Sequence, residues 1–107
     1  MPIQQLSAIE LKNKIREKEQ PFLLDVREPF EFAHAHIDGS VLIPLNQIPQ
    51  RLREIDIDQE IVLICHHGIR SMQAANFLAQ VGFKQVSNLV GGIDAWSIEV
   101  DSSVARY

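Results

Sequence analysis

The sequence predicts a small α/β domain in which a mainly parallel central sheet is flanked by helices. Short apolar runs typical of strands alternate with helical patterns along the chain. The most apolar run, Glu60–Ile64, suits a central parallel strand that is covered on both faces. With 107 residues and 46% hydrophobic content, residues 1–107 are expected to form one domain.

The first helix is expected to begin directly after Ser7. Ser7 can act as the N-cap and Glu10 as its capping-box partner, and the helix would continue to about Lys18. The residues expected on its buried face share helical spacing: Ala8, Leu11 and Ile15.

The middle of the chain alternates strand and helix signals. A buried strand over 22–26 should be followed by a short helix from Pro29, because proline suits the first helical turn. After a strand over 41–43, helical spacing returns, and it predicts a helix from about Asn46 with Pro49 in its first turn.

The last third begins with a predicted helix over 71–81. Gly82 is suited to the left-handed position after this helix, with Phe83 as the apolar residue that follows. A strand over 85–89 should then lead to a short helix near Trp96. The residues expected to face inward on the 71–81 helix are Ala74, Ala75, Leu78 and Val81.

The segment Cys65–Ser71 is where the sequence predicts the chemistry. It follows the most apolar strand and leads into a helix, so it should lie at the carboxyl end of the sheet, where α/β proteins form their sites. Cys65 is the only cysteine and the candidate nucleophile. Free backbone N–H groups of the loop and the charge of Arg70 should favour its thiolate form.

The other loop residues have more than one expected role. Gly68 gives the backbone freedom to curl. Ser71 could cap the helix or donate its hydroxyl to a bound group, and the cap is favoured. His66 and His67 could tune the charge near neutral pH or simply face solvent. The plain alternative for Cys65 is a small buried residue at a strand end.

Several motifs of the chain together resemble those of rhodanese-domain sulfurtransferases. The stretch from Cys65 to Arg70 resembles the family's active-site loop. Leu24–Glu28 is similar to its Asp-Val-Arg signature, and His36–Ser40 to a segment that often reads Gly-His-Ile-Pro-Gly-Ala. Asn88–Trp96 is similar to the family's Gly-Gly-x-x-x-Trp ending, so the likeness covers nearly the whole chain.

The resemblance implies a sulfurtransferase that uses Cys65 as its catalytic residue. Cys65 would take a sulfane sulfur from a donor such as thiosulfate and pass it to cyanide or a thiol through a persulfide. Asp25 and Arg27 would support the site structurally, with Arg27 paired to a carboxylate. No cofactor and no metal are expected. The loop residues that would hold the substrate are His66, His67, Gly68, Ile69, Arg70 and Ser71.

Other functions stay open at this stage. A persulfide relay to a sulfur-carrier protein differs by partner, and the tail from Val100 to Tyr107 resembles tails of rhodanese domains in sulfur-transfer pathways. A cysteine phosphatase or arsenate reductase would need a wider loop, because only four residues separate Cys65 from Arg70. A binding module without activity is the remaining alternative.

Composition narrows the partners and the compartment. A net charge of -4 and scattered basic residues argue against a nucleic-acid partner. No apolar run is long enough for a membrane span, and Met1–Gln5 does not resemble a signal peptide. One cysteine gives no internal disulfide, so we expect a cytoplasmic protein.

Overall fold

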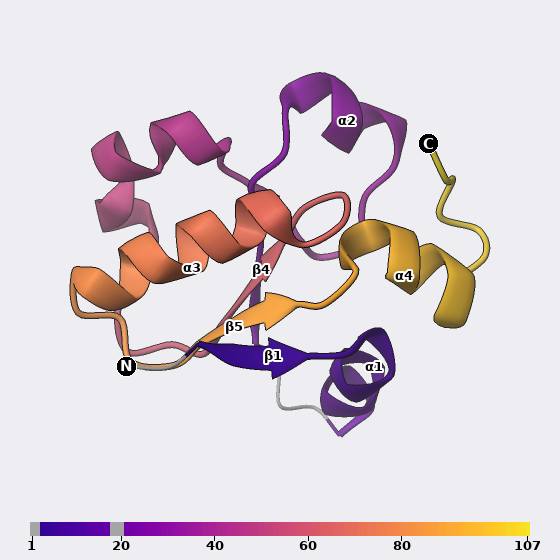
Figure 1. Ribbon diagram of the computed structural model, residues 1–107, viewed down its shortest axis with the longest axis horizontal. Helices are drawn as coiled ribbons and strands as arrows, with labels where there is room; N and C mark the ends of the chain where they lie inside the picture. The colour runs from indigo at the N-terminus through magenta and orange to yellow at the C-terminus, as the bar shows by residue number, and fades with distance from the viewer. Residues whose placement is uncertain (1–2, 18–20) are drawn as a thin grey trace.

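One parallel sheet organises the computed structural model, which describes residues 3–17 and 21–107. Its strand order is β1-β5-β4-β2-β3, and every neighbouring pair is parallel. The predicted α/β class is therefore confirmed (Figure 1). The strands are β1 (Gln4–Leu6), β2 (Phe22–Asp25), β3 (Val41–Leu42), β4 (Ile61–Ile64) and β5 (Val86–Leu89).

Helices cover both faces of this sheet. Helix α3 and the segment between β3 and β4 pack on one face, and α1 and α4 pack on the other. None of the described helices is long and apolar enough to cross a bilayer. The cytoplasmic compartment stays a prediction from the sequence. The helices are α1 (Ala8–Arg16), α2 (Pro29–His34), α3 (Ile69–Gln80) and α4 (Gly92–Glu99), with 3₁₀ helices η1 (Leu45–Gln50) and η2 (Leu52–Glu54).

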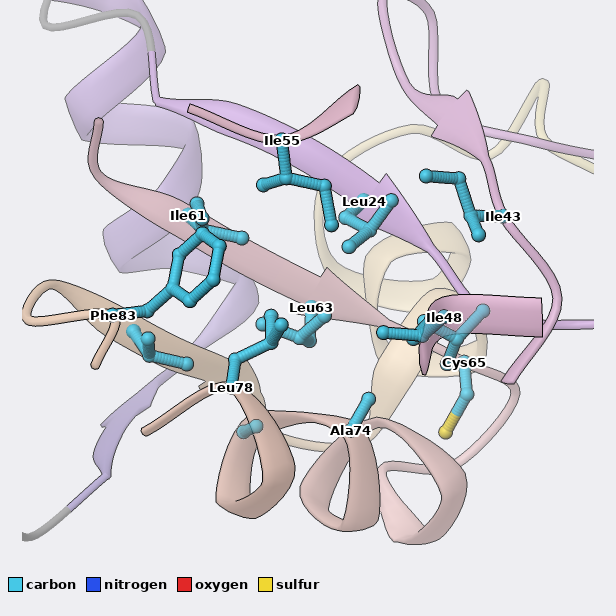
Figure 2. Close-up of a cluster of buried hydrophobic side chains, with 13 residues drawn as sticks. Leu24, Ile43, Ile48, Ile55, Ile61, Leu63, Cys65, Ala74, Leu78 and Phe83 are labelled. Atoms are coloured by element: carbon cyan, nitrogen blue, oxygen red, sulfur yellow. The ribbon is translucent and has the colours of Figure 1, made fainter. Parts of the chain in front are cut away.

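Alternation along β4 decides on which face of the sheet the Cys65 side chain lies. Ile61 and Leu63 belong to the core cluster beneath α3, whereas Val62 and Ile64 belong to the cluster beneath α1 and α4. The period of two continues one residue past the strand, so Cys65 falls on the α3 side. Figure 2 shows its sulfur at the end of this cluster, beside the first turn of α3.

Two helix ends follow the sequence prediction closely. The Ser7 and Glu10 capping box is formed at the start of α1. At the end of α3, Gly82 is left-handed with φ of 108°, and its N–H donates to the Ala79 carbonyl. The Phe83 N–H donates to the Leu78 carbonyl, which completes a Schellman motif and ends the helix.

Three element predictions were wrong. The predicted helix from Asn46 is the pair η1 and η2, because in an α-helix the ring of Pro49 would meet the carbonyl four residues earlier. Helix α3 begins at Ile69 rather than Ser71, because left-handed Gly68 already starts it. The sequence prediction missed β1, whose residues Gln4–Gln5 are polar and exposed.

Two residues predicted to face the core lie at the surface instead. Ile15 is 40% exposed and Val81 is 42% exposed. Both stand at the C-terminal ends of their helices, beyond the turns whose residues are buried on the sheet. The predicted end of the first helix at Lys18 lies outside the described residues.

The start of α4 is pressed against the backbone of the Cys65 loop. Ile93 donates its N–H to the Cys65 carbonyl at 2.8 Å, and Asp94 donates to the His66 carbonyl at 3.2 Å. A Cβ atom on Gly92 would overlap both of these carbonyl oxygens. Glycine is therefore required at position 92 by this close approach, which holds the loop backbone against the start of α4.

Replacing Gly92 by alanine should destabilise the protein severely. Gly39→Ala is the matched control, because Gly39 also has a positive φ but a Cβ there meets nothing within 4 Å. We expect Gly39→Ala to cost about 1–2 kcal/mol of unfolding free energy, and Gly92→Ala at least about 2 kcal/mol more. Urea denaturation of both variants measures the difference, and equal losses would contradict the close approach.

Candidate active site

The sulfur of Cys65 lies where the loop turns into α3. Its Sγ accepts a hydrogen bond from the Gly68 N–H at 3.0 Å, and Cys65 is only 1% exposed. Gly68 is the N-cap of α3 and has φ of 107°, a left-handed conformation that glycine adopts without strain. The sulfur therefore stands at the positive end of the α3 dipole.

Ser71 faces this sulfur and does not cap the helix. It is the third residue of α3 and fully buried, so the favoured cap prediction was wrong. Its Oγ lies 3.2 Å from Sγ and donates to Oδ1 of Asn88 at 2.5 Å. Because the Ser71 proton points to Asn88, the Cys65 thiol can donate its own proton to Ser71.

Asn88 was not predicted as part of the site. It lies in β5, is 5% exposed, and its Nδ2 donates to Oε1 of Gln5 at 3.1 Å. The available signal was a polar residue in an otherwise buried strand, since buried amides need partners. A chain of hydrogen-bonding groups thus runs from the thiol through Ser71 and Asn88 to the edge strand β1.

Arg70 is held by a carboxylate that the sequence analysis overlooked. Its two terminal nitrogens donate to Oε1 and Oε2 of Glu31 at 2.6 and 2.9 Å. Hydrogen bonds from Arg70 are the main reason that the pKa of Glu31 falls to about 2, against the opposing effect of burial. The pKa of Arg70 is raised by the same bonds first, and the Cys65 charge contributes too. The anion-binding role expected for Arg70 must therefore compete with Glu31.

Asp25 and Arg27 form a pair with no exposed surface. The Arg27 guanidinium donates to Oδ2 of Asp25 at 2.7 Å and to the Ala35 carbonyl at 2.6 Å. Its other terminal nitrogen donates to the Tyr107 hydroxyl at 2.7 Å. Arg27 thus pairs with a carboxylate and ties the end of β2 to the end of α2 and to the tail.

The two loop histidines lie at the mouth of the site. The His66 ring stacks on His67 and on Tyr107, with centroids 4.0 Å apart in each case. Burial lowers the pKa of His66, and the neighbouring His67 lowers it further, so His66 is neutral at pH 7. His67 is exposed, and its Nε2 lies 3.8 Å from Asp94, which also pairs with Arg106 at 3.0 Å.

The two loop histidines and Asp94 form a cluster of groups that can ligate metals. His66, His67 and Asp94 offer ligand atoms within 4.8 Å of one another. The two rings stack nearly face to face with centroids 4.0 Å apart, so the lone pairs of their nitrogens lie in two nearly parallel planes that do not meet at one metal position. Asp94 already accepts from Arg106. The three residues are therefore better placed to cover the loop by ring stacking and ion pairing than to bind a metal ion.

A separate pocket lies behind the tail. It has a volume of about 530 Å³ and is formed by α1, residues 33–38, Trp96 and residues 100–105. None of the residues Cys65–Ser71 lines it. The pocket is thus separate from Cys65 and from the groups that hydrogen-bond to its sulfur.

Glu31→Gln should change how stability depends on pH. The pKa of Glu31 is lowered from 4.5 to about 2, so its carboxylate stabilises the fold above pH 4.5 and loses this effect as pH falls toward 2. The ionised carboxylate contributes at most about 3 kcal/mol to the free energy of unfolding, because Arg70 is partly solvated. Urea denaturation between pH 7 and 2.5 should show a flatter profile for Glu31→Gln. The control Glu99→Gln, exposed at the end of α4, should follow the wild type; parallel Glu31→Gln and wild-type profiles would contradict this reasoning.

Comparisons with known proteins agree with the fold. The family model described as a rhodanese-like domain matches residues 7–99. The Bacillus subtilis protein YtwF, which carries a sulfurtransferase name, is 41% identical over 99 residues, covering 92% of this chain and 95% of that protein. The thiosulfate sulfurtransferase GlpE of Pseudoalteromonas translucida is 32% identical, covering 87% of this chain and 89% of its own.

Structural similarity gives the same result. The crystal structure of a rhodanese-like domain protein from Staphylococcus aureus superposes with a TM-score of 0.86 at 28% identity, covering 98% of this chain and 99% of that one. The resemblance seen in the sequence motifs is thereby confirmed. Relatives that are named sulfurtransferases support rhodanese-type sulfur transfer as the activity. The chain belongs to the rhodanese-like domain family of sulfurtransferases.

Proposed function

We propose that this protein moves a sulfane sulfur from a donor such as thiosulfate to cyanide or a thiol through a persulfide on Cys65. The observation that carries the proposal is the position of Sγ, 3.0 Å from the Gly68 N–H at the start of α3. A negatively charged sulfur is stabilised at such a helix start by amide donors and by the helix dipole.

The reaction proceeds by two displacements at sulfur. In the first, the Cys65 thiolate attacks the outer sulfur of thiosulfate, the S–S bond of the donor breaks, and sulfite leaves with the electron pair. In the second, cyanide attacks the outer sulfur of the persulfide, thiocyanate leaves, and the thiolate is restored. A thiol acceptor would take the sulfur as its own persulfide, with its proton given up to solvent.

The loop residues have distinct parts in this proposal. The backbone between His66 and Ser71 surrounds the outer sulfur, with Gly68 as the donor to Sγ. The Ser71 hydroxyl, 3.2 Å from Sγ, accepts the thiol proton or turns its own proton toward the thiolate. Arg70 binds the anionic donor by sharing its guanidinium with Glu31.

Cys65→Ser should abolish sulfur loading while leaving the fold intact, because a hydroxyl lacks the nucleophilicity of a thiolate. Intact-mass measurement after thiosulfate treatment should show one added sulfur on the wild type and none on the variant. Cyanide should then remove this sulfur. An unmodified wild type, or equal loading of the serine variant, would refute the proposal.

A persulfide relay with a protein partner is the second candidate. The two most exposed apolar side chains near the loop are Phe30, 74% exposed, and Ile69, 75% exposed. Each is the chain neighbour of one member of the Glu31 and Arg70 ion pair, so both lie on the rim of the site. Solvated apolar side chains beside a reactive group favour contact with another protein.

The double variant Phe30→Ser with Ile69→Ser separates the two candidates. If the partner is a protein, loading from a persulfidated protein donor should weaken about tenfold, whereas loading from thiosulfate should stay within about twofold. Ile57→Ser is the matched control, because Ile57 is also exposed, at 46%, but precedes β4 at the opposite end of the sheet. Equal effects on both donors would count against the relay.

A further inference from the structure

The segment 101–107 returns from α4 to the active site. The Ser97 hydroxyl donates to the Val104 carbonyl at 2.6 Å, and Val104 packs against the core cluster that contains Trp96. Arg106 then pairs with Asp94 at 3.0 Å. Figure 1 shows this yellow segment running from α4 to end beside α2. The tail is thus attached at successive points, and it ends on the residues that hold the loop.

The hydroxyl of Tyr107 joins the two ion pairs behind the loop. It accepts from the Arg27 guanidinium at 2.7 Å and donates to Oε2 of Glu31 at 2.9 Å. Arg27 is fully buried on Asp25, and Glu31 is the partner of Arg70. Tyr107 is therefore the side chain through which the fixed buried pair meets the pair that includes a loop residue.

The ring of Tyr107 covers the residue that follows the nucleophile. It stacks on the His66 ring at 4.0 Å with an interplanar angle of 10°. The other stacking partner of His66 is His67. Nε2 of His66 is buried and has no hydrogen-bond partner within residues 3–17 and 21–107. His66 is thus held by stacking contacts, of which the tail supplies one, and by a hydrogen bond with the Tyr107 backbone.

We propose that Tyr107 is a positioning residue of the Cys65 site: its hydroxyl holds the Glu31 carboxylate on Arg70, and its ring fixes His66 beside the nucleophile. The inference goes beyond the sulfur transfer proposed above and depends on it only for the effect on turnover. Through Tyr107, the segment 101–107 thus helps to position residues of the active site.

The two parts of the side chain make separable contributions. Loss of the hydroxyl leaves a buried Arg27 N–H with a poorer partner, the Glu31 carbonyl at 3.4 Å, and removes one donor from the Glu31 carboxylate. Loss of the ring uncovers His66. Because burial is the main cause of the lowered pKa of His66, uncovering the ring should raise that pKa. The charged or titratable groups around His66 are His67, Asp94, Glu31, Tyr107 and, through Asp94, Arg106.

Tyr107→Phe and Tyr107→Ala test both contributions in the full chain. Ser103→Ala is the control, because Ser103 is exposed in the same segment and its hydroxyl bonds to the Asp101 carboxylate rather than to a group of the site. Three measurements are made on each variant: the NMR titration of His66, the rate of Cys65 alkylation by iodoacetamide, and the kcat and KM for sulfur loading from thiosulfate.

The proposal predicts a different pattern for each variant. Tyr107→Ala should raise the pKa of His66, change the alkylation rate at least threefold and lower kcat/KM about tenfold. Tyr107→Phe should leave the His66 titration as in the wild type, because the ring remains. It should still lower kcat/KM about threefold, because the hydroxyl is lost. Ser103→Ala should match the wild type in all three measurements.

The outcomes keep this proposal separate from the proposed function. A wild type that loads no sulfur would refute the function, whereas the His66 titration and the alkylation rate would still report whether Tyr107 positions the site. Wild-type titration and alkylation in Tyr107→Ala would overturn the inference, even with full sulfur transfer. Equal loss of kcat/KM in Ser103→Ala would overturn it as well, because the effect would then belong to the whole segment.

Discussion

The carboxylate of Glu31 is the interaction on which the arrangement of the site depends. It accepts two hydrogen bonds from Arg70, one from the Tyr107 hydroxyl and one from the Glu28 N–H. Three segments therefore meet on one buried anion: the first turn of α2, the start of α3 and the tail. A buried charge is costly when it is unpaired. Displacing any one of these segments would therefore remove a hydrogen bond from the Glu31 carboxylate and weaken the position of the other two.

This arrangement leaves the mouth of the site with little unbalanced charge. Arg70 is neutralised by Glu31, Arg27 by Asp25, and Arg106 by Asp94. His66 is uncharged at neutral pH because burial lowers its pKa. Stabilisation of an anionic sulfur therefore falls mainly to the amide donors at the start of α3, which are fixed by the backbone. Such preorganised donors need no rearrangement when charge develops.

Local sequence patterns were enough to predict four of the five strands and to place the Cys65 loop directly after β4. The apolar run of β4 and the Cys65 to Arg70 loop both depend on neighbours in the chain, as do the Ser7 capping box and the Gly82 helix end. The partnerships that shape the site join residues far apart: 17 positions separate Ser71 from Asn88, 39 separate Arg70 from Glu31, and 76 separate Tyr107 from Glu31. No periodicity marks such pairs, so the structure was needed to find them. The cap assignment of Ser71 was wrong for a related reason. The start of α3 is set by the left-handed backbone of Gly68, and this conformation could not be read from the residue types alone.

The hydrogen bonds from Ser71 through Asn88 to Gln5 connect the surroundings of the Cys65 thiol to the edge of the sheet. Strand β1 pairs only with β5, and its Gln5 supplies the acceptor that orients the Asn88 amide. Edge strands are the parts of a sheet that open most readily. Loss of the β1 contact would remove the Gln5 acceptor from the Asn88 amide, which would then be oriented toward Ser71 with one hydrogen bond fewer. The hydroxyl beside the Cys65 sulfur thus owes part of its orientation to a side chain on an edge strand, which lies two strands away from β4 in the sheet.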